Sequence, residues 1–125
     1  MLHRTLLRTA ALGGAAIVAL AVSLPVALGR PTAAPSAKST FVSTCGSCHT
    51  LKAAGTHGAV GPDLDKVMLS QSQLVTAIAK GGSAVMTKAQ RAKYKVTMPP
   101  FASLGAAKIK SLAAYVHSSM SMAMH

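Results

Sequence analysis

The pentapeptide Cys45-Gly46-Ser47-Cys48-His49 has the pattern Cys-x-x-Cys-His, which is typical of covalent attachment of a c-type haem. Two thiols three residues apart on one helical turn can each bond to one vinyl group of the porphyrin. The adjacent His49 then lies under the iron and supplies an axial nitrogen. Cys45 and Cys48 are the only cysteines in the chain, so the motif uses both. The sequence therefore predicts one haem c held by Cys45, Cys48 and His49.

Three other sites use similar spacing, and each lacks a feature that it needs. A thioredoxin-like Cys-x-x-Cys requires a βαβ context, and no strand-rich pattern surrounds Cys45. A structural zinc site requires four ligands, and a second pair of ligands near Cys45 and Cys48 is missing from the sequence. A disulfide between the two cysteines would leave His49 without a role. The motif favours haem over all three.

Length and composition are consistent with a small core built around a cofactor. The chain has 125 residues, which is enough for one domain. It has two Phe, two Tyr and no Trp, so few large side chains are available to fill a core. A buried porphyrin would supply the missing apolar volume.

The charge of the chain is strongly positive, with thirteen Lys and Arg against two acidic residues. Such a surface favours redox partners with acidic docking surfaces, or an anionic membrane surface, and speeds encounter with them. Nucleic acid is the other common partner of basic chains. The sequence has no helix-turn-helix, zinc-finger or base-stacking aromatic pattern, so we expect no nucleic acid as a partner. We also expect the protein to be a monomer.

Residues 1–29 have the features of a targeting segment. Arg4 and Arg8 give a positive start, and an uncharged run rich in Ala, Leu and Val follows. A cleaved signal peptide and an uncleaved membrane anchor are both open interpretations, because the run lies between their usual lengths. Both place the remaining chain outside the cytoplasm, in the periplasm or on the outer face of the membrane. Residues 30–37, which contain two prolines, then read as a linker.

The remaining chain predicts an all-α domain over residues 38–118. A first helix over 38–44 brings Phe41 to the same face as Cys45. A second helix over 70–80 has Ser70 and Gln73 spaced as a capping box. A third helix over 105–118 has apolar residues at three- and four-residue spacing. Residues 83–97 lack a clear apolar period. They are either a solvated basic loop or a short exposed helix, or else a docking surface for an acidic partner.

Two proline-containing segments carry the other candidate site residues. Pro62 has no N–H, but its carbonyl can accept a hydrogen bond from the far ring nitrogen of His49. Met98 precedes Pro99 and Pro100, which exclude helix and hold Met98 in extended or turn geometry. A thioether on such a rigid stretch is well placed to be a fixed ligand. A simple turn at Pro62 is the alternative interpretation.

Other side chains with ligating atoms have weaker contexts. His57 lies in a glycine-flanked loop, where a solvated histidine is the usual outcome, and Met86 lies in the long 83–97 segment. Residues 119–125 contain Met120, Met122 and Met124 before His125. Thioethers and imidazole suit Cu(I), although a flexible, frayed terminus is the simpler interpretation of this tail.

Taken in order, these segments resemble the small class I, monohaem cytochromes c of bacteria. The residues that carry the resemblance are Phe41, the Cys-x-x-Cys-His motif, Gly61-Pro62-Asp63-Leu64, Ile78 with Gly81, Met98-Pro99, and a last helix with Tyr115. The resemblance implies a few helices wrapped around one covalent haem. It also implies His49 as proximal ligand, supported by Pro62, and Met98 as distal ligand. The interval between Gly81 and Met98 is longer than is usual in the family, which leaves Met86 open as a rival ligand.

The function implied by this resemblance is one-electron transfer between respiratory or dehydrogenase partners outside the cytoplasm. A His/Met pair closes both axial positions and leaves no site for a substrate, so we expect an electron carrier rather than an enzyme. Two alternatives remain. One is a haem-based enzyme or gas sensor in which Met98 is displaced, and the other is an electron-entry subunit of a larger oxidoreductase.

Overall fold

The structure is a computed structural model that describes residues 35–125. The expected targeting segment at residues 1–29, and most of the linker at 30–37, lie outside the described residues. Within residues 35–125, no helix combines the length and the apolar character needed to cross a membrane.

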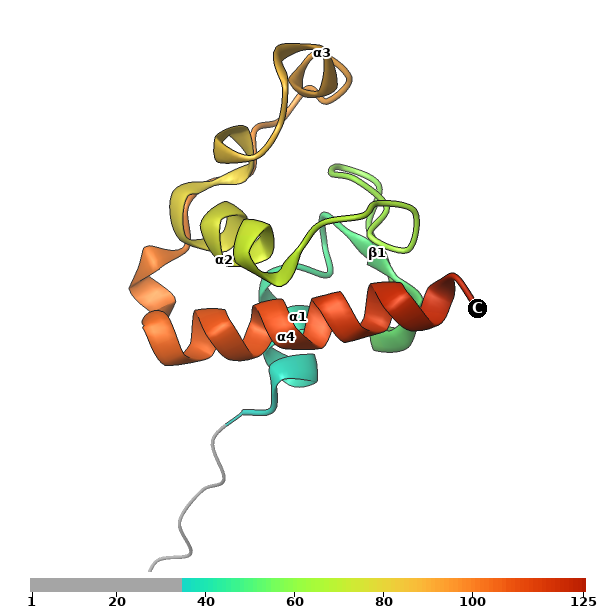
Figure 1. Cartoon of the computed structure of the whole chain (residues 1–125), viewed down its shortest axis with the longest axis vertical. Helices are drawn as coiled ribbons and strands as arrows, with labels where there is room; N and C mark the ends of the chain where they lie inside the picture. The colour runs from blue at the N-terminus through green and yellow to red at the C-terminus, as the bar shows by residue number, and fades with distance from the viewer. Residues whose placement is uncertain (1–34) are drawn as a thin grey trace, which may run out of the picture. The chain divides into compact units, whose positions relative to one another are not determined.

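The described chain is mainly helical, as predicted (Figure 1). Its α-helices are α1 (Ala37–Thr44), α2 (Gln71–Lys80), α3 (Lys88–Arg91) and α4 (Ala106–Ala123). Three 3-10 turns, η1 (Lys52–Ala54), η2 (Gly82–Ala84) and η3 (Ala102–Leu104), separate them. One feature was not predicted: β1 (Thr50–Leu51) and β2 (Thr56–His57) form a short antiparallel pair within the expected loop. Two-residue strands are too short to show an alternating pattern in sequence.

The core forms where α4 packs against α1 and α2. Apolar side chains from all three helices are buried there, namely Phe41, Leu74, Ile78, Ile109, Leu112, Ala113, Val116 and Met120. Phe41 and Tyr115 meet edge to face, with ring centroids 6.3 Å apart, a favoured aromatic geometry. This contact joins the first helix to the last.

Helix α2 begins and ends as its sequence predicts. Ser70 Oγ accepts from Gln73 N at 3.2 Å, and Gln73 Oε1 accepts from Ser70 N at 2.9 Å, so the capping box is complete. Leu74, Ala77 and Ile78 are buried. Gly81, at φ +92, ends the helix with a backbone conformation that favours glycine.

Helix α4 differs from its prediction at its C-terminal end. Its N-cap is Gly105 and no side chain caps it. The helix continues to Ala123 rather than ending at Ser118, and Met120 is only 3% exposed. The interpretation of residues 119–125 as a frayed tail is therefore wrong for most of its length. Burial of Met120 explains the extension, because packing of an apolar face is the main source of helix stability in proteins.

We expect Phe41→Ala to destabilise the fold by about 3–5 kcal/mol, the usual loss for truncating a buried Phe. Phe41 is 1% exposed, whereas its neighbour Val42 is 46% exposed. Urea unfolding followed by far-UV circular dichroism measures both, and Val42→Ala in the same helix is the matched control. Equal losses for the two variants would contradict the assignment of Phe41 to the core.

Candidate haem-attachment site

The two thiols and the imidazole of the motif lie on one turn that follows α1. Cys45 N donates to Phe41 O at 2.8 Å, and His49 N donates to Cys45 O at 2.9 Å. Both bonds have the i to i−4 spacing of a helix, so the backbone continues in a helical conformation from α1 through the motif. Cys45, Cys48 and His49 all line one cavity. This is the arrangement that attachment of a porphyrin at two points requires.

The thiols do not have the environment of a redox-active pair. Both are free in the structure. Burial, with a smaller contribution from the nearby Cys48, raises the pKa of the Cys45 thiol to about 11. Reactive Cys-x-x-Cys thiols show a lowered pKa, so thiol exchange is disfavoured. Residues 35–125 hold no group of three His, Cys, Asp or Glu side chains suited to a metal.

The ring of His49 is oriented by the loop that contains Pro62. His49 Nδ1 lies 2.9 Å from the Pro62 carbonyl oxygen, so the expected hydrogen bond is present. A carbonyl only accepts, so Nδ1 carries the ring proton and Nε2 keeps its lone pair. No described residue hydrogen-bonds to Nε2. The imidazole is 8% exposed and is held in the tautomer that an axial ligand needs.

Gly61 leaves room for this imidazole. A Cβ added at Gly61 would lie 2.6 Å from His49 Cε1 and 3.0 Å from Nδ1. Gly61 N also donates to Cys48 O at 2.8 Å, which ties the loop to the motif. The backbone therefore approaches the ring as closely as only glycine permits.

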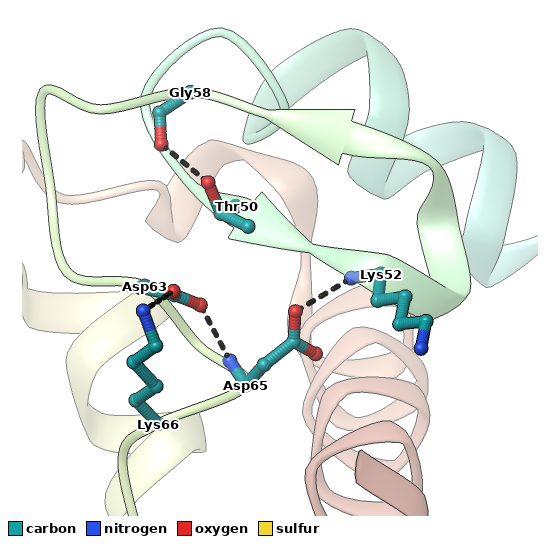
Figure 2. Close-up of polar contacts among 6 residues, drawn as sticks. All are labelled: Thr50, Lys52, Gly58, Asp63, Asp65 and Lys66. Carbon is teal, nitrogen blue, oxygen red and sulfur yellow. Dashed lines mark hydrogen bonds and ion pairs between the residues drawn. The ribbon is translucent and has the colours of Figure 1, made fainter.

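The loop around Pro62 is fixed by both acidic residues of the chain (Figure 2). Asp65 Oδ2 accepts from Lys52 N at 2.9 Å, and Asp63 Oδ1 accepts from Asp65 N at 3.0 Å. Lys66 Nζ lies 3.0 Å from Asp63 Oδ2, and this hydrogen bond lowers the pKa of the Asp63 carboxyl. The stability that the Asp63–Lys66 interaction contributes is fully present above the ordinary pKa of Asp. It is lost as the pH falls through the lowered pKa of Asp63.

Met98 is held in place by the C-terminal end of α2. Gly82 N donates to Met98 O at 3.2 Å, and Phe101 N donates to Ile78 O at 2.8 Å. A Cβ added at Gly81 would lie 2.8 Å from Met98 O. The Met98 side chain also packs against the core cluster. The segment that begins at Met98 is thus fixed by backbone bonds and by packing, as its two prolines predict.

Met86, the rival ligand that the long interval left open, lies close to Met98. A Cβ added at Gly82 would lie 3.8 Å from the sulfur of each methionine. Met86 O accepts from the Arg91 guanidinium at 2.9 Å, and Ser83 O accepts from it at 3.2 Å. These bonds close the segment 83–91, which includes the short exposed helix α3 that was one predicted outcome. Two thioethers therefore line the same cavities.

Two adjoining cavities, of about 80 and 430 Å³, share a wall that contains the candidate ligands. The residues that line both are Cys45, His49, Pro62, Gly82, Met86, Tyr94 and Met98. The remainder of the larger cavity is mostly aliphatic side chains of the core, including Leu74, Ile78 and Leu112. Its volume falls in the roughly 300–1,000 Å³ range of small-molecule and cofactor sites.

The donor set and the cavity fit a c-type haem. Two thiols, an imidazole with a free lone pair and a thioether all line an apolar space, and this combination suits a covalently attached porphyrin with axial nitrogen and sulfur. His57 does not belong to the site, because it is exposed on β2 and lines neither cavity. The role of each residue as a ligand stays a prediction.

Comparison with known proteins identifies the family. Residues 32–116 match the family model described as cytochrome c oxidase, cbb3-type, subunit III. No curated protein and no solved structure matches the chain. The match covers the motif, the Pro62 loop and Met98, and domains of this family bind c-type haem covalently. The chain is thus a small monohaem cytochrome c that belongs to the cbb3-type cytochrome family.

Proposed function

We propose that this cytochrome domain carries one electron at a time, with its iron held between His49 and Met98. The observation that carries the proposal is that an oriented imidazole and a fixed thioether line the same cavities. Met98 is favoured over Met86 because it packs against the core and precedes two prolines, whereas Met86 is not among the residues packed on the core.

A His/Met pair raises the reduction potential of haem and fills both axial positions. The work of this chain is then to hold the two ligands in similar positions in both oxidation states. The hydrogen bond between His49 Nδ1 and Pro62 O holds the imidazole. The hydrogen bond from Gly82 N to Met98 O holds the backbone of the segment that carries the Met98 sulfur. Aliphatic side chains such as Leu74 and Leu112 line the larger cavity and would give a haem there apolar surroundings.

Carbon monoxide binding separates this carrier from a haem enzyme or gas sensor. Filled axial positions predict that the ferrous protein binds carbon monoxide poorly at neutral pH. Rapid, stoichiometric binding, followed by the visible spectrum, would show that the sulfur leaves the iron readily. That result would contradict the proposal and favour the sensor or enzyme.

The basic residues of segment 83–97 form the proposed docking surface for an acidic redox partner. Lys88, Arg91, Lys93 and Lys95 are all exposed. Arg91 lines the smaller cavity and Lys93 lines the larger one, so positive charge borders the candidate haem site. Both acidic residues of the chain lie instead in the Pro62 loop. Charge of one sign beside the site steers an oppositely charged partner.

We expect the rate of electron transfer to anionic ferricyanide to fall as salt rises, because ions screen the attraction. Lys93→Gln with Lys95→Gln should slow the reaction at low salt. Lys108→Gln with Lys110→Gln removes the same charge from α4, whose lysines line neither cavity, and is the matched control. Stopped-flow kinetics measures both pairs. An equal slowing in both would assign the effect to net charge and contradict a local docking surface.

A second candidate function is electron entry into a membrane-bound oxidase. The observation that favours it is the description of the matching family as subunit III of a cytochrome c oxidase. Family members are typically extracytoplasmic, which agrees with either function. Purification in mild detergent distinguishes them: a stable stoichiometric complex with an oxidase indicates a subunit, and elution as a free monomer indicates a shuttle.

A further inference from the structure

A third cavity, of about 280 Å³, is lined by His117, Met120 and Met124, which do not line the haem cavities, and by Met68, which also lines the larger of them. It lies between α4 and the segment 67–70 that precedes α2. Figure 1 shows this segment leading from the Pro62 loop into α2, on the side of α4 that faces α2. Four side chains with soft or borderline donor atoms line the cavity, namely Met68, His117, Met120 and Met124.

Three of these residues share one face of α4. His117, Met120 and Met124 follow the three- and four-residue spacing that places side chains on one side of a helix. Met122 lies about 160° around the helix from both Met120 and Met124, is 66% exposed and does not line the cavity. Extension of α4 to Ala123 is what brings Met124 into this group. The alternating methionines of the tail thus separate into two that face the cavity and one that does not.

Met68 completes the group from outside the helix. Its side chain is 72% exposed, which is unusual for a methionine that precedes a packed helix. His117 is half-buried, and its ring has no hydrogen bond with any described residue. An accessible thioether and an imidazole without a hydrogen bond therefore line the same cavity as Met120 and Met124. Burial of Met120 keeps one donor fixed at the inner wall.

We propose that this cavity is a binding site for monovalent copper, with Met68, His117, Met120 and Met124 as ligands. Thioethers are soft ligands that select Cu(I), and imidazole also suits copper. The other lining residues are Val67, Leu69, Ser70 and Ser121. The cavity therefore has no carboxylate, which Mg²⁺ and Ca²⁺ require, and no thiolate, which structural zinc sites commonly use. The chemistry of the donor set is thus selective for a soft cation.

The test is a titration of the full-length, haem-loaded protein with Cu(I). Ascorbate keeps the haem ferrous, so that it does not oxidise the metal, and the buffer is free of oxygen. Covalent haem occupies Cys45 and Cys48, so these sulfurs do not compete as thiols. A coloured Cu(I) chelator reports the affinity by competition. We expect about one Cu(I) per chain, since the four donors form one group around one cavity.

Substitution of the lining residues tests where the metal binds. Met68→Leu and Met124→Leu should each weaken binding by more than the roughly 10-fold that loss of an outer-shell partner costs. Met122→Leu removes a sulfur from the same helix end and should leave the affinity unchanged. Leucine nearly conserves the volume of methionine, and circular dichroism verifies the fold of each variant. X-ray absorption at the copper edge should show sulfur neighbours that decrease in the two cavity variants.

Two results would overturn the proposal. One is failure of the haem-loaded protein to compete with the chelator. The other is unchanged affinity in the Met68→Leu, Met124→Leu double variant, which would place the copper elsewhere on the chain. Equal weakening by Met122→Leu would likewise show that the cavity is not the site.

Discussion

Replacement of Met98 by leucine is expected to abolish the iron–methionine charge-transfer band of the ferric protein. Leucine lacks the sulfur but nearly conserves the volume, so the fold should lose less than about 1.5 kcal/mol. Loss of the sulfur should also lower the reduction potential, by part of the roughly 0.8 V range that axial ligands span. Visible spectroscopy and redox titration of the purified protein measure the two effects.

Met86→Leu is the matched control for Met98→Leu. Both methionines line both cavities, and their sulfurs lie at the same distance from a Cβ added at Gly82. Only Met98 packs against the core cluster and is anchored by Gly82 N. We therefore expect Met86→Leu to keep the band and the potential. If the band persists in Met98→Leu and disappears in Met86→Leu, the ligand is Met86 and the assignment of Met98 is wrong.

Gly61→Ala should displace the imidazole of His49. The added Cβ would lie 2.6 Å from His49 Cε1, so the ring or the loop must move, at a cost of about 1–3 kcal/mol. Moving the ring weakens its bond to Pro62 O, and an imidazole without that bond is a less basic ligand. We expect a lower yield of haem-loaded protein and a higher reduction potential in the fraction that is loaded.

Gly55→Ala separates ligand displacement from loss of stability. A Cβ at Gly55 would meet no atom within 4 Å, but the residue has φ +71, so alanine there costs about 1–2 kcal/mol in backbone strain. The two variants should show similar losses in urea unfolding, and only Gly61→Ala should change the potential. Equal shifts in potential would mean that the close approach of Gly61 to the ring has no part in holding the ligand.

Local signals predicted the parts of the fold that depend on neighbouring residues. The capping box of Ser70 and Gln73 forms as predicted, because it needs only a three-residue spacing. The contact of Phe41 with Tyr115 joins the first and last helices, both of which were predicted. The hydrogen bond from His49 to Pro62 joins residues 13 apart in the chain, and it was expected from the chemistry of an imidazole that binds iron.

Features that depend on packing between distant segments could not be predicted in the same way. The end of α4 is set by burial of Met120, and a small polar and methionine-rich tail carries no local sign of such packing. The proximity of Met86 to Met98 depends on the path of segment 83–97, which Arg91 fixes through two backbone carbonyls. The cavity shared by Met68, His117 and Met124 likewise exists only in the folded chain.

X-ray absorption at the iron edge of the purified protein tests the central claim most directly. The account predicts one sulfur and five nitrogen neighbours, which are the four porphyrin nitrogens, His49 and Met98. The same neighbours should remain in Met86→Leu, and the sulfur should be absent in Met98→Leu. An iron without sulfur in the unaltered protein, or one that keeps sulfur in Met98→Leu, would contradict it.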